Sequence, residues 1–206
     1  VYLEQGLCDK AESEFSACVK IDGLKNEAFY YLGETYFAVE KYEQARDNFI
    51  KALNLNFENS AIHYKLGVIY FKENELESSA SEFKKLLAAD RENIDAYYHL
   101  ALIEMAYAKY DEAILKLRKV VNKRSTSDIY VKIAEALYKS DNFEAAVEEA
   151  QKSLQKDAAC VDAHYFLGLS LKELKKYRDA ELSFNRCREI DPKYYRAQLE
   201  LGIIYN

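Results

Sequence analysis

Apolar residues recur along most of the chain at the three- and four-residue spacing of an amphipathic α-helix. Residues 26–59 hold two such stripes, separated by a polar break at Glu40 and Lys41. Neither predicted helix can bury its stripe alone, so the two must pack on each other and on their neighbours. The first stripe is formed by Phe29, Leu32, Gly33 and Tyr36, and the second by Tyr42, Ala45, Phe49, Ala52 and Leu53.

A Leu-Gly pair, or a close variant of it, returns at a nearly constant interval. Successive pairs are 34, 34, 33, 34 and 34 residues apart, a period typical of stacked helical repeats. A protein of this kind acts through an extended surface. The pairs are Leu32-Gly33, Leu66-Gly67, Leu100-Ala101, Ile133-Ala134, Leu167-Gly168 and Leu201-Gly202.

Small residues within the stripes predict close helix packing. Gly33 and Ala45 lack bulk where two helices cross, and Phe49 is expected to fill the space beside them. The helix ends also carry signals. Ser60, Asn93 and Ser127 are expected to cap helices, and Pro192 is expected to follow a helix that ends near Ile190.

The pattern resembles that of the tetratricopeptide repeat (TPR) family, which has an aromatic, Leu-Gly, Tyr, Ala, an aromatic, a small residue and a late Pro. Residues 26–59 match all but the last, where Phe57 stands. The resemblance implies an all-α fold, a right-handed α-solenoid of antiparallel helix pairs called a TPR superhelix. It divides residues 1–206 into a partial repeat at 1–25 (Tyr2, Ala11, Phe15, Cys18), complete repeats at 26–59, 60–93, 94–126, 127–160 and 161–194, and the first helix of a further repeat at 195–206.

Two neighbouring repeats, 94–126 and 127–160, depart from the pattern. Ala101 replaces Gly, Glu104 replaces Tyr, Val120 replaces a small residue and Ala150 replaces the second aromatic. Two interpretations are open: a local change of superhelical curvature near residues 100–150, or neutral drift in a tolerant repeat.

In the TPR family the first helix of each pair lines the concave wall, and this implies where a partner would bind. Tyrosine suits such a wall because it combines a large apolar area with few rotors and a hydroxyl. A groove of this kind would accept a peptide or an amphipathic helix of a partner protein. The alternative is that the aromatics pack between neighbouring first helices. The predicted partner-binding residues are Tyr30, Glu34, Phe37, Tyr64, Val68, Phe71, Tyr98, Leu102, Met105, Val131, Glu135, Tyr138, Tyr165 and Leu169.

Charge narrows the choice of partner. The net charge of −6 weighs against nonspecific binding to nucleic acid or to anionic membranes, and no apolar run within the sequence is long enough to span a bilayer. Family members that bind the acidic C-termini of chaperones use Lys, Asn and Arg at set positions of the first helices. In this chain those positions hold other residues, so we do not expect such a partner. Acidic residues begin several first helices, where they either complement the helix dipole or favour basic ligands: Glu27, Asp95, Asp128 and Asp162.

Sequence motifs for catalysis are absent. There is no Gly-rich phosphate loop and no H-E-x-x-H, so we predict no enzyme activity, no cofactor and no metal. His63 and His164 share a repeat position three units apart and are expected to be packing or surface residues. Cys18 and Cys187 are expected to be small core residues, and unpaired thiols favour a cytoplasmic location.

The sequence thus predicts a noncatalytic scaffold or adaptor. Two other hypotheses stay open: the substrate-recruiting arm of a larger enzyme, such as a glycosyltransferase, or a structural subunit that stacks through its ends. The chain begins with Val and in mid-pattern, so we expect a fragment of a longer array. Residues 195–206 lack a covering helix, which predicts self-association there or contact with further residues.

Overall fold

The chain folds into α-helices. The computed structural model describes residues 7–57 and 59–206, and within these ranges it contains no β-strand, which confirms the all-α prediction. Tyr2 lies outside the described residues. The helices are α1 (Cys8–Cys18), a short 3-10 helix η1 (Asp22–Leu24), α2 (Lys25–Ala38), α3 (Tyr42–Asn54), α4 (Ser60–Lys72), α5 (Leu76–Ala89), α6 (Ile94–Ala106), α7 (Tyr110–Lys123), α8 (Ser127–Lys139), α9 (Phe143–Lys156), α10 (Val161–Glu173), α11 (Tyr177–Ile190) and α12 (Tyr195–Tyr205).

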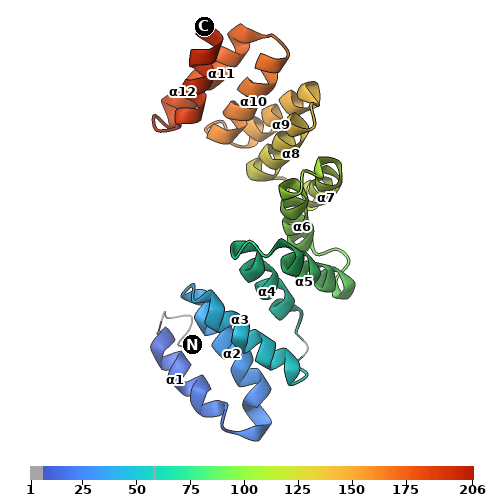
Figure 1. Ribbon diagram of the computed structural model, residues 1–206, viewed down its shortest axis with the longest axis vertical. Helices are drawn as coiled ribbons and strands as arrows, with labels where there is room; N and C mark the ends of the chain where they lie inside the picture. The colour runs from blue at the N-terminus through green and yellow to red at the C-terminus, as the bar shows by residue number, and fades with distance from the viewer. Residues whose placement is uncertain (1–6, 58) are drawn as a thin grey trace. The chain divides into compact units, whose positions relative to one another are not determined.

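Consecutive helices form antiparallel hairpins, as Figure 1 shows for α2 with α3 and for α10 with α11. We call the first member of each pair a first helix and the other a second helix. A second helix also packs on the first helix that follows it, as α9 does on α10. Each apolar stripe is therefore buried from two sides, which a single amphipathic helix cannot achieve.

The chain divides into two compact units, an N-terminal unit that ends at Ala96 and a C-terminal unit that begins at Tyr97. The core of the N-terminal unit contains Ala45, Phe49 and Leu66. The C-terminal unit has one cluster around Ala101 and Leu117, and another around Ala180 and Phe184. These residues come from the stripes that the sequence predicted to be apolar.

Glycine in the Leu-Gly pair is required by its contact with a phenylalanine. A Cβ atom added to Gly33 would lie 2.6 Å from the ring of Phe49, far inside van der Waals contact. Gly168 stands in the same relation to Phe184, also at 2.6 Å. The close helix approach expected at Gly33 is confirmed.

In two repeats an alanine replaces the glycine of the Leu-Gly pair, and the residue sixteen positions later is then smaller than phenylalanine. Where the glycine is replaced by Ala101, the residue sixteen positions later is Leu117 and not Phe, and both are fully buried. Where it is replaced by Ala134, the same position holds Ala150. At Ala101 and Leu117 the added methyl group and the smaller second side chain nearly preserve packing volume, whereas Ala150 removes more volume than Ala134 adds. The predicted change of curvature stays a prediction.

A left-handed residue closes the turn inside every pair. Glu40, Asn74, Ala108, Asp141 and Lys175 all have φ between 57° and 60°. The residue after each donates its N–H back to the preceding helix, as Lys41 does to the carbonyl of Tyr36 at 2.9 Å. This is a common way to end a helix.

The predicted helix caps are partly wrong. Asn93 accepts a hydrogen bond from the Ala96 amide at 3.0 Å, as a cap should. Ser60 is instead the first residue of α4, and the preceding Asn59 accepts from the Ala61 amide at 2.9 Å. Ser127 is also the first residue of its helix, and its hydroxyl lies 2.7 Å from that of Ser153. Serine and asparagine are both favoured caps, so the difference lies in helix register: α4 and α8 each begin one residue earlier than the sequence predicted. Pro192 follows α11, which ends at Ile190 as predicted.

The cysteines differ in burial. Cys187 is fully buried, and burial raises the pKa of its thiol to about 12. Cys18 is only half-buried, so its prediction as a core residue is wrong. All four cysteines are free. Among the described helices, none combines the length and the apolar character needed to cross a bilayer.

Candidate functional site

The predicted partner-binding residues of the N-terminal unit are all half-buried on α2 and α4. We call them the N-terminal first-helix face: Tyr30, Glu34, Phe37, Tyr64, Val68 and Phe71. The Tyr30 ring lies 5.3 Å from that of Phe57, and the Phe37 ring lies 5.8 Å from that of Tyr42. One side of each ring therefore packs on the core, while part of it stays accessible. These contacts are made with the second helix α3 and with the turn after it, and partner binding by these side chains stays a prediction.

Lys65 links the two helices of this face. Its ammonium lies 4.2 Å from the centre of the Phe37 ring and 3.5 Å from a carboxylate oxygen of Glu34. A cation over an aromatic face and beside a carboxylate is stabilised by both. One oxygen of Glu34 is thus paired with Lys65, and its other oxygen is buried with no hydrogen-bond partner among the described residues.

A shallow hollow lies beside Tyr64. Its volume is about 220 Å³, and its lining mixes apolar with polar groups. The ring of Tyr64 lies 6.2 Å from that of Phe83, which fixes its inner edge. The other lining residues are Ser60, Ala61, Leu86, Asn93 and Asp95. A hollow of this volume is large enough for one amino-acid side chain.

The C-terminal unit carries the other predicted partner-binding residues on the first helices α6, α8 and α10. Two predicted residues do not belong to it: Val131 is 4% exposed and Leu169 is 6% exposed, so both are core residues. Val131 lies on α8 and Leu169 lies on α10, two helices that pack against each other. The C-terminal first-helix face therefore consists of the half-buried Tyr98, Leu102, Met105, Glu135, Tyr138 and Tyr165.

Residues of the C-terminal first-helix face pack against two hydrophobic core clusters. Tyr98, Met105 and Tyr138 border one core cluster, and Tyr138 and Tyr165 border the next. Tyr165 also contacts Tyr194, which comes from the turn before α12, at 5.3 Å between ring centres. Tyr194 could not be predicted from the apolar spacing, because it lies just before a helix and not on a first-helix stripe.

Burial raises the pKa of four phenols on the two faces, and nearby carboxylates raise it further; these are Tyr30, Tyr98, Tyr138 and Tyr165. For Tyr98 the carboxylate is Asp128, and for Tyr138 it is Glu173. The phenols therefore stay protonated and can donate hydrogen bonds to a partner. Tyr194 already does so within the chain, since its hydroxyl donates to Asp162 at 2.8 Å.

Charged groups on the C-terminal face neutralise one another. Glu135 accepts hydrogen bonds from Lys132 and Lys139, each at 2.9 Å. Lys172 donates to Glu200 at 2.5 Å. Asp128 and Asp162 lie in the first turns of α8 and α10, where a carboxylate complements the helix dipole.

Glu135 should make stability depend on pH. Burial alone would raise its pKa, but the hydrogen bonds from Lys139 and Lys132 outweigh burial and hold the pKa below its usual value. A carboxyl whose pKa is lower in the folded state stabilises the fold at neutral pH, and this contribution is lost as the pH falls through the folded pKa. We expect Glu135→Gln to lower the free energy of unfolding at pH 7 by about 0.5–1 kcal/mol and to reduce its fall on acidification.

Urea unfolding at neutral and acidic pH measures this. Glu189→Gln is the matched control, because Glu189 pairs with Arg186 on an exposed surface. Equal pH slopes for wild type and Glu135→Gln would contradict the assignment.

The histidines have structural partners. Nδ1 of His63 lies 2.7 Å from Glu82, and Nε2 of His164 lies 3.1 Å from the carbonyl of Ala158. In the ranges that the structure describes, no three His, Cys, Asp or Glu side chains gather in a way that could hold a metal ion.

Family models match three stretches of the chain. Residues 33–74 match "TPR repeat", residues 64–128 match "Tetratricopeptide repeat", and residues 109–187 match "Anaphase-promoting complex, cyclosome, subunit 3". A search of the curated proteins gave no significant match.

Solved structures share the fold. MamA is 23% identical, with 68% of this chain and 82% of that one covered and a TM-score of 0.63. YrrB, described as "a TPR protein with an unusual peptide-binding site", is 18% identical, with 90% and 96% covered and a TM-score of 0.78. MamA from Desulfovibrio magneticus RS-1 is 16% identical, with 82% and 96% covered and a TM-score of 0.76. At these identities the likeness concerns the fold.

Proposed function

Because the chain belongs to the tetratricopeptide repeat family, we propose that it is a noncatalytic scaffold that binds a peptide or an amphipathic helix of a partner protein. The repeats at 26–59, 60–93, 94–126, 127–160 and 161–194 would form one array, with the two first-helix faces as its binding surfaces. Peptide binding by the similar YrrB supports this reading.

One observation carries the proposal: the aromatic side chains of both faces are held on their inner side and accessible on the other. A ring that is fixed before binding loses little conformational entropy when a partner covers it. Its phenol stays protonated and can donate to a backbone carbonyl of the ligand. Such rings are typical anchors of protein interfaces.

The bound segment should be largely apolar. The carboxylates of Glu34 and Glu135 are met by Lys65 and by Lys132 and Lys139. A ligand charge would have to compete with these internal pairs, whereas an apolar side chain only covers ring area. The hollow beside Tyr64 would take one side chain of the segment.

Selection from a random-peptide library, followed by titration of the selected peptides, tests the proposal. We expect Tyr64→Ala to weaken peptides bound by the N-terminal face at least about tenfold, and Tyr98→Ala to do so for the C-terminal face. Helicity measured by circular dichroism should be unchanged. Tyr177→Ala is the matched control, since Tyr177 is an exposed tyrosine on the second helix α11. Unchanged affinity in both face variants would refute the proposal.

A further inference from the structure

The hollow beside Tyr64 is lined by an aromatic ring and a carboxylate. Tyr64 of α4 and Asp95 of α6 both line it, and Ala61 and Leu86 add apolar area. The side chains of Tyr64 and Asp95 are each half-buried. Such a lining suits a long cationic side chain, because the apolar stem covers apolar area while the cation meets the ring and the carboxylate.

The next repeat already contains a cation in this setting, supplied by the chain itself. The guanidinium of Arg124 lies 5.9 Å from the centre of the Tyr98 ring. Burial and the charge of Asp128 raise the pKa of Tyr98, whereas the charge of Arg124 opposes the rise, so both charges act on this phenol. Tyr98 is the fifth residue of α6, as Tyr64 is of α4. Asp128 is the second residue of α8, as Asp95 is of α6.

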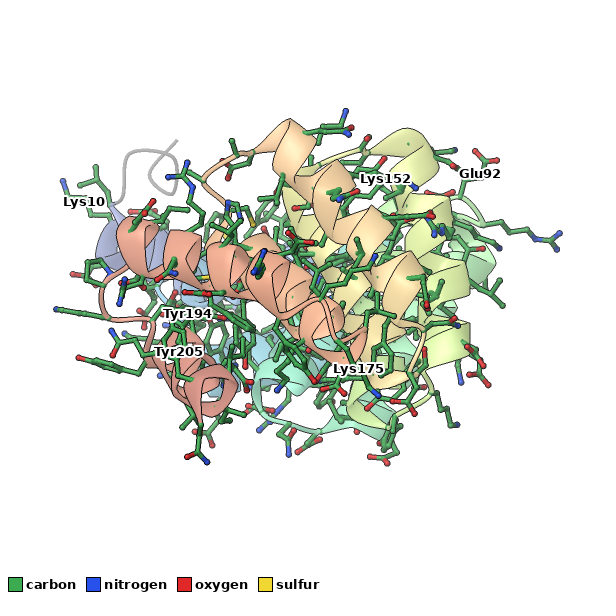
Figure 2. The ribbon with its side chains drawn as sticks, turned by 90° about the horizontal axis from the view of Figure 1, so that it is seen from above. Lys10, Glu92, Lys152, Lys175, Tyr194 and Tyr205 are labelled. Carbon is green, nitrogen blue, oxygen red and sulfur yellow. The ribbon has the colours of Figure 1, made fainter. Side chains whose placement is uncertain are left out.

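The position that supplies this cation holds an acid in the repeat of Tyr64. Asp90 and Arg124 directly follow α5 and α7, and their backbones match, with φ of −132° and −133° and ψ of 98° and 95°. The carboxylate of Asp90 is bonded to its own loop, because it accepts from the Glu92 amide at 3.0 Å and from Nδ2 of Asn93 at 3.4 Å. In Figure 2 the side chain of Glu92 extends outward from this loop. No arginine stands at this position, and the hollow beside Tyr64 is open.

We propose that the hollow binds an arginine of the partner segment, with its guanidinium against the Tyr64 ring and paired with Asp95. This inference rests on the proposed peptide binding by the N-terminal first-helix face and names the one charged side chain that the face selects. Arginine fits better than lysine, because its planar guanidinium can stack on a ring while its N–H groups bond a carboxylate. A carboxylate has about four lone-pair sites, so Asp95 can accept from the arginine in addition to its partners within the chain.

Peptides selected from the random library by the N-terminal first-helix face test this inference. We expect the peptides whose binding depends on Tyr64 to share an arginine. Replacing that arginine by citrulline, which has nearly the same shape and no charge, should weaken binding to the wild type at least about tenfold. Asp95→Asn should remove most of this difference. Asp111→Asn is the matched control, since Asp111 is the second residue of α7, a second helix, and it should leave the difference unchanged.

Asp90→Arg gives a second test, because it places an arginine at the position of Arg124. The new side chain should fill the hollow from within the chain and weaken the Tyr64-dependent peptides at least about tenfold. Asp157→Arg is the matched control. Asp157 directly follows α9 in the C-terminal unit and also accepts from a loop amide, that of Ala159, at 3.0 Å. Both variants lose a hydrogen bond of the same kind, but only the first brings a cation to Tyr64.

The outcomes separate the arginine site from peptide binding itself. Selected peptides that need Tyr64 but share no arginine, or that bind equally well with citrulline, overturn the arginine site and leave peptide binding standing. Equal effects of Asp90→Arg and Asp157→Arg on these peptides overturn it as well. If no selected peptide depends on Tyr64, peptide binding by the N-terminal first-helix face fails, and the arginine site fails with it.

Discussion

Gly33→Ala is expected to lower the free energy of unfolding by about 1–3 kcal/mol, although alanine is the better helix former. The new Cβ atom would lie 2.6 Å from two carbons of the Phe49 ring. Phe49 is fully buried among the residues of the N-terminal core, so it cannot turn away without displacing its neighbours. The loss should appear as an earlier midpoint in urea unfolding followed by circular dichroism.

The chain itself suggests the compensating change. Ala101 and Leu117 occupy the positions of Gly33 and Phe49, and both are fully buried in the C-terminal unit. Phe49→Leu alone should cost about 1 kcal/mol because it leaves unfilled volume. Combined with Gly33→Ala it should cost less than the sum of the two changes, with a favourable coupling of about 1–2 kcal/mol.

Gly202→Ala provides the control, because no atom lies within 4 Å of the added carbon. It should be neutral or slightly stabilising in the isolated chain, since alanine favours the helix. Strictly additive effects of Gly33→Ala and Phe49→Leu would show that the ring contact does not set the requirement for glycine.

This coupling explains what the sequence could and could not predict. The helices and the core at Phe49 follow from apolar spacing, because a repeated pattern leaves few ways to bury each stripe. The departures at Ala101 and Ala150 looked like unrelated events in the sequence. The structure places Ala101 and Leu117 in one core cluster, which explains why these two departures occur together.

The positions of the first-helix faces were predictable to a similar extent. Spacing alone placed Tyr64 and Tyr98 on first helices, and the structure finds both half-buried. Spacing could not tell that Val131 and Leu169 are covered, because burial at a given position depends on how the helices pack around it. Nor could it find Lys65 between Glu34 and Phe37, because ion pairs between helices depend on side-chain conformation.

Arg118→Met is expected to lower the free energy of unfolding of the C-terminal unit by about 2 kcal/mol, because it removes the partner of a buried charge. Glu149 on α9 is 2% exposed, and its Oε1 accepts from Arg118 of α7 and from Lys152, each at 2.8 Å. Its other oxygen is buried with no hydrogen-bond partner among the described residues. Without Arg118 the carboxylate would keep a single donor.

Removing the buried charge as well should undo most of this loss. Glu149→Met together with Arg118→Met is expected to lie within about 1 kcal/mol of wild type, since two apolar side chains replace a costly buried pair. Arg186→Met is the matched control: Arg186 pairs with Glu189 at 2.5 Å, but both are more than half exposed. That change should cost less than about 0.5 kcal/mol. An equal cost for Arg118→Met and Arg186→Met in urea unfolding would contradict this prediction. The buried charge of Glu149 would then be stabilised by Lys152 or by water, and not by Arg118.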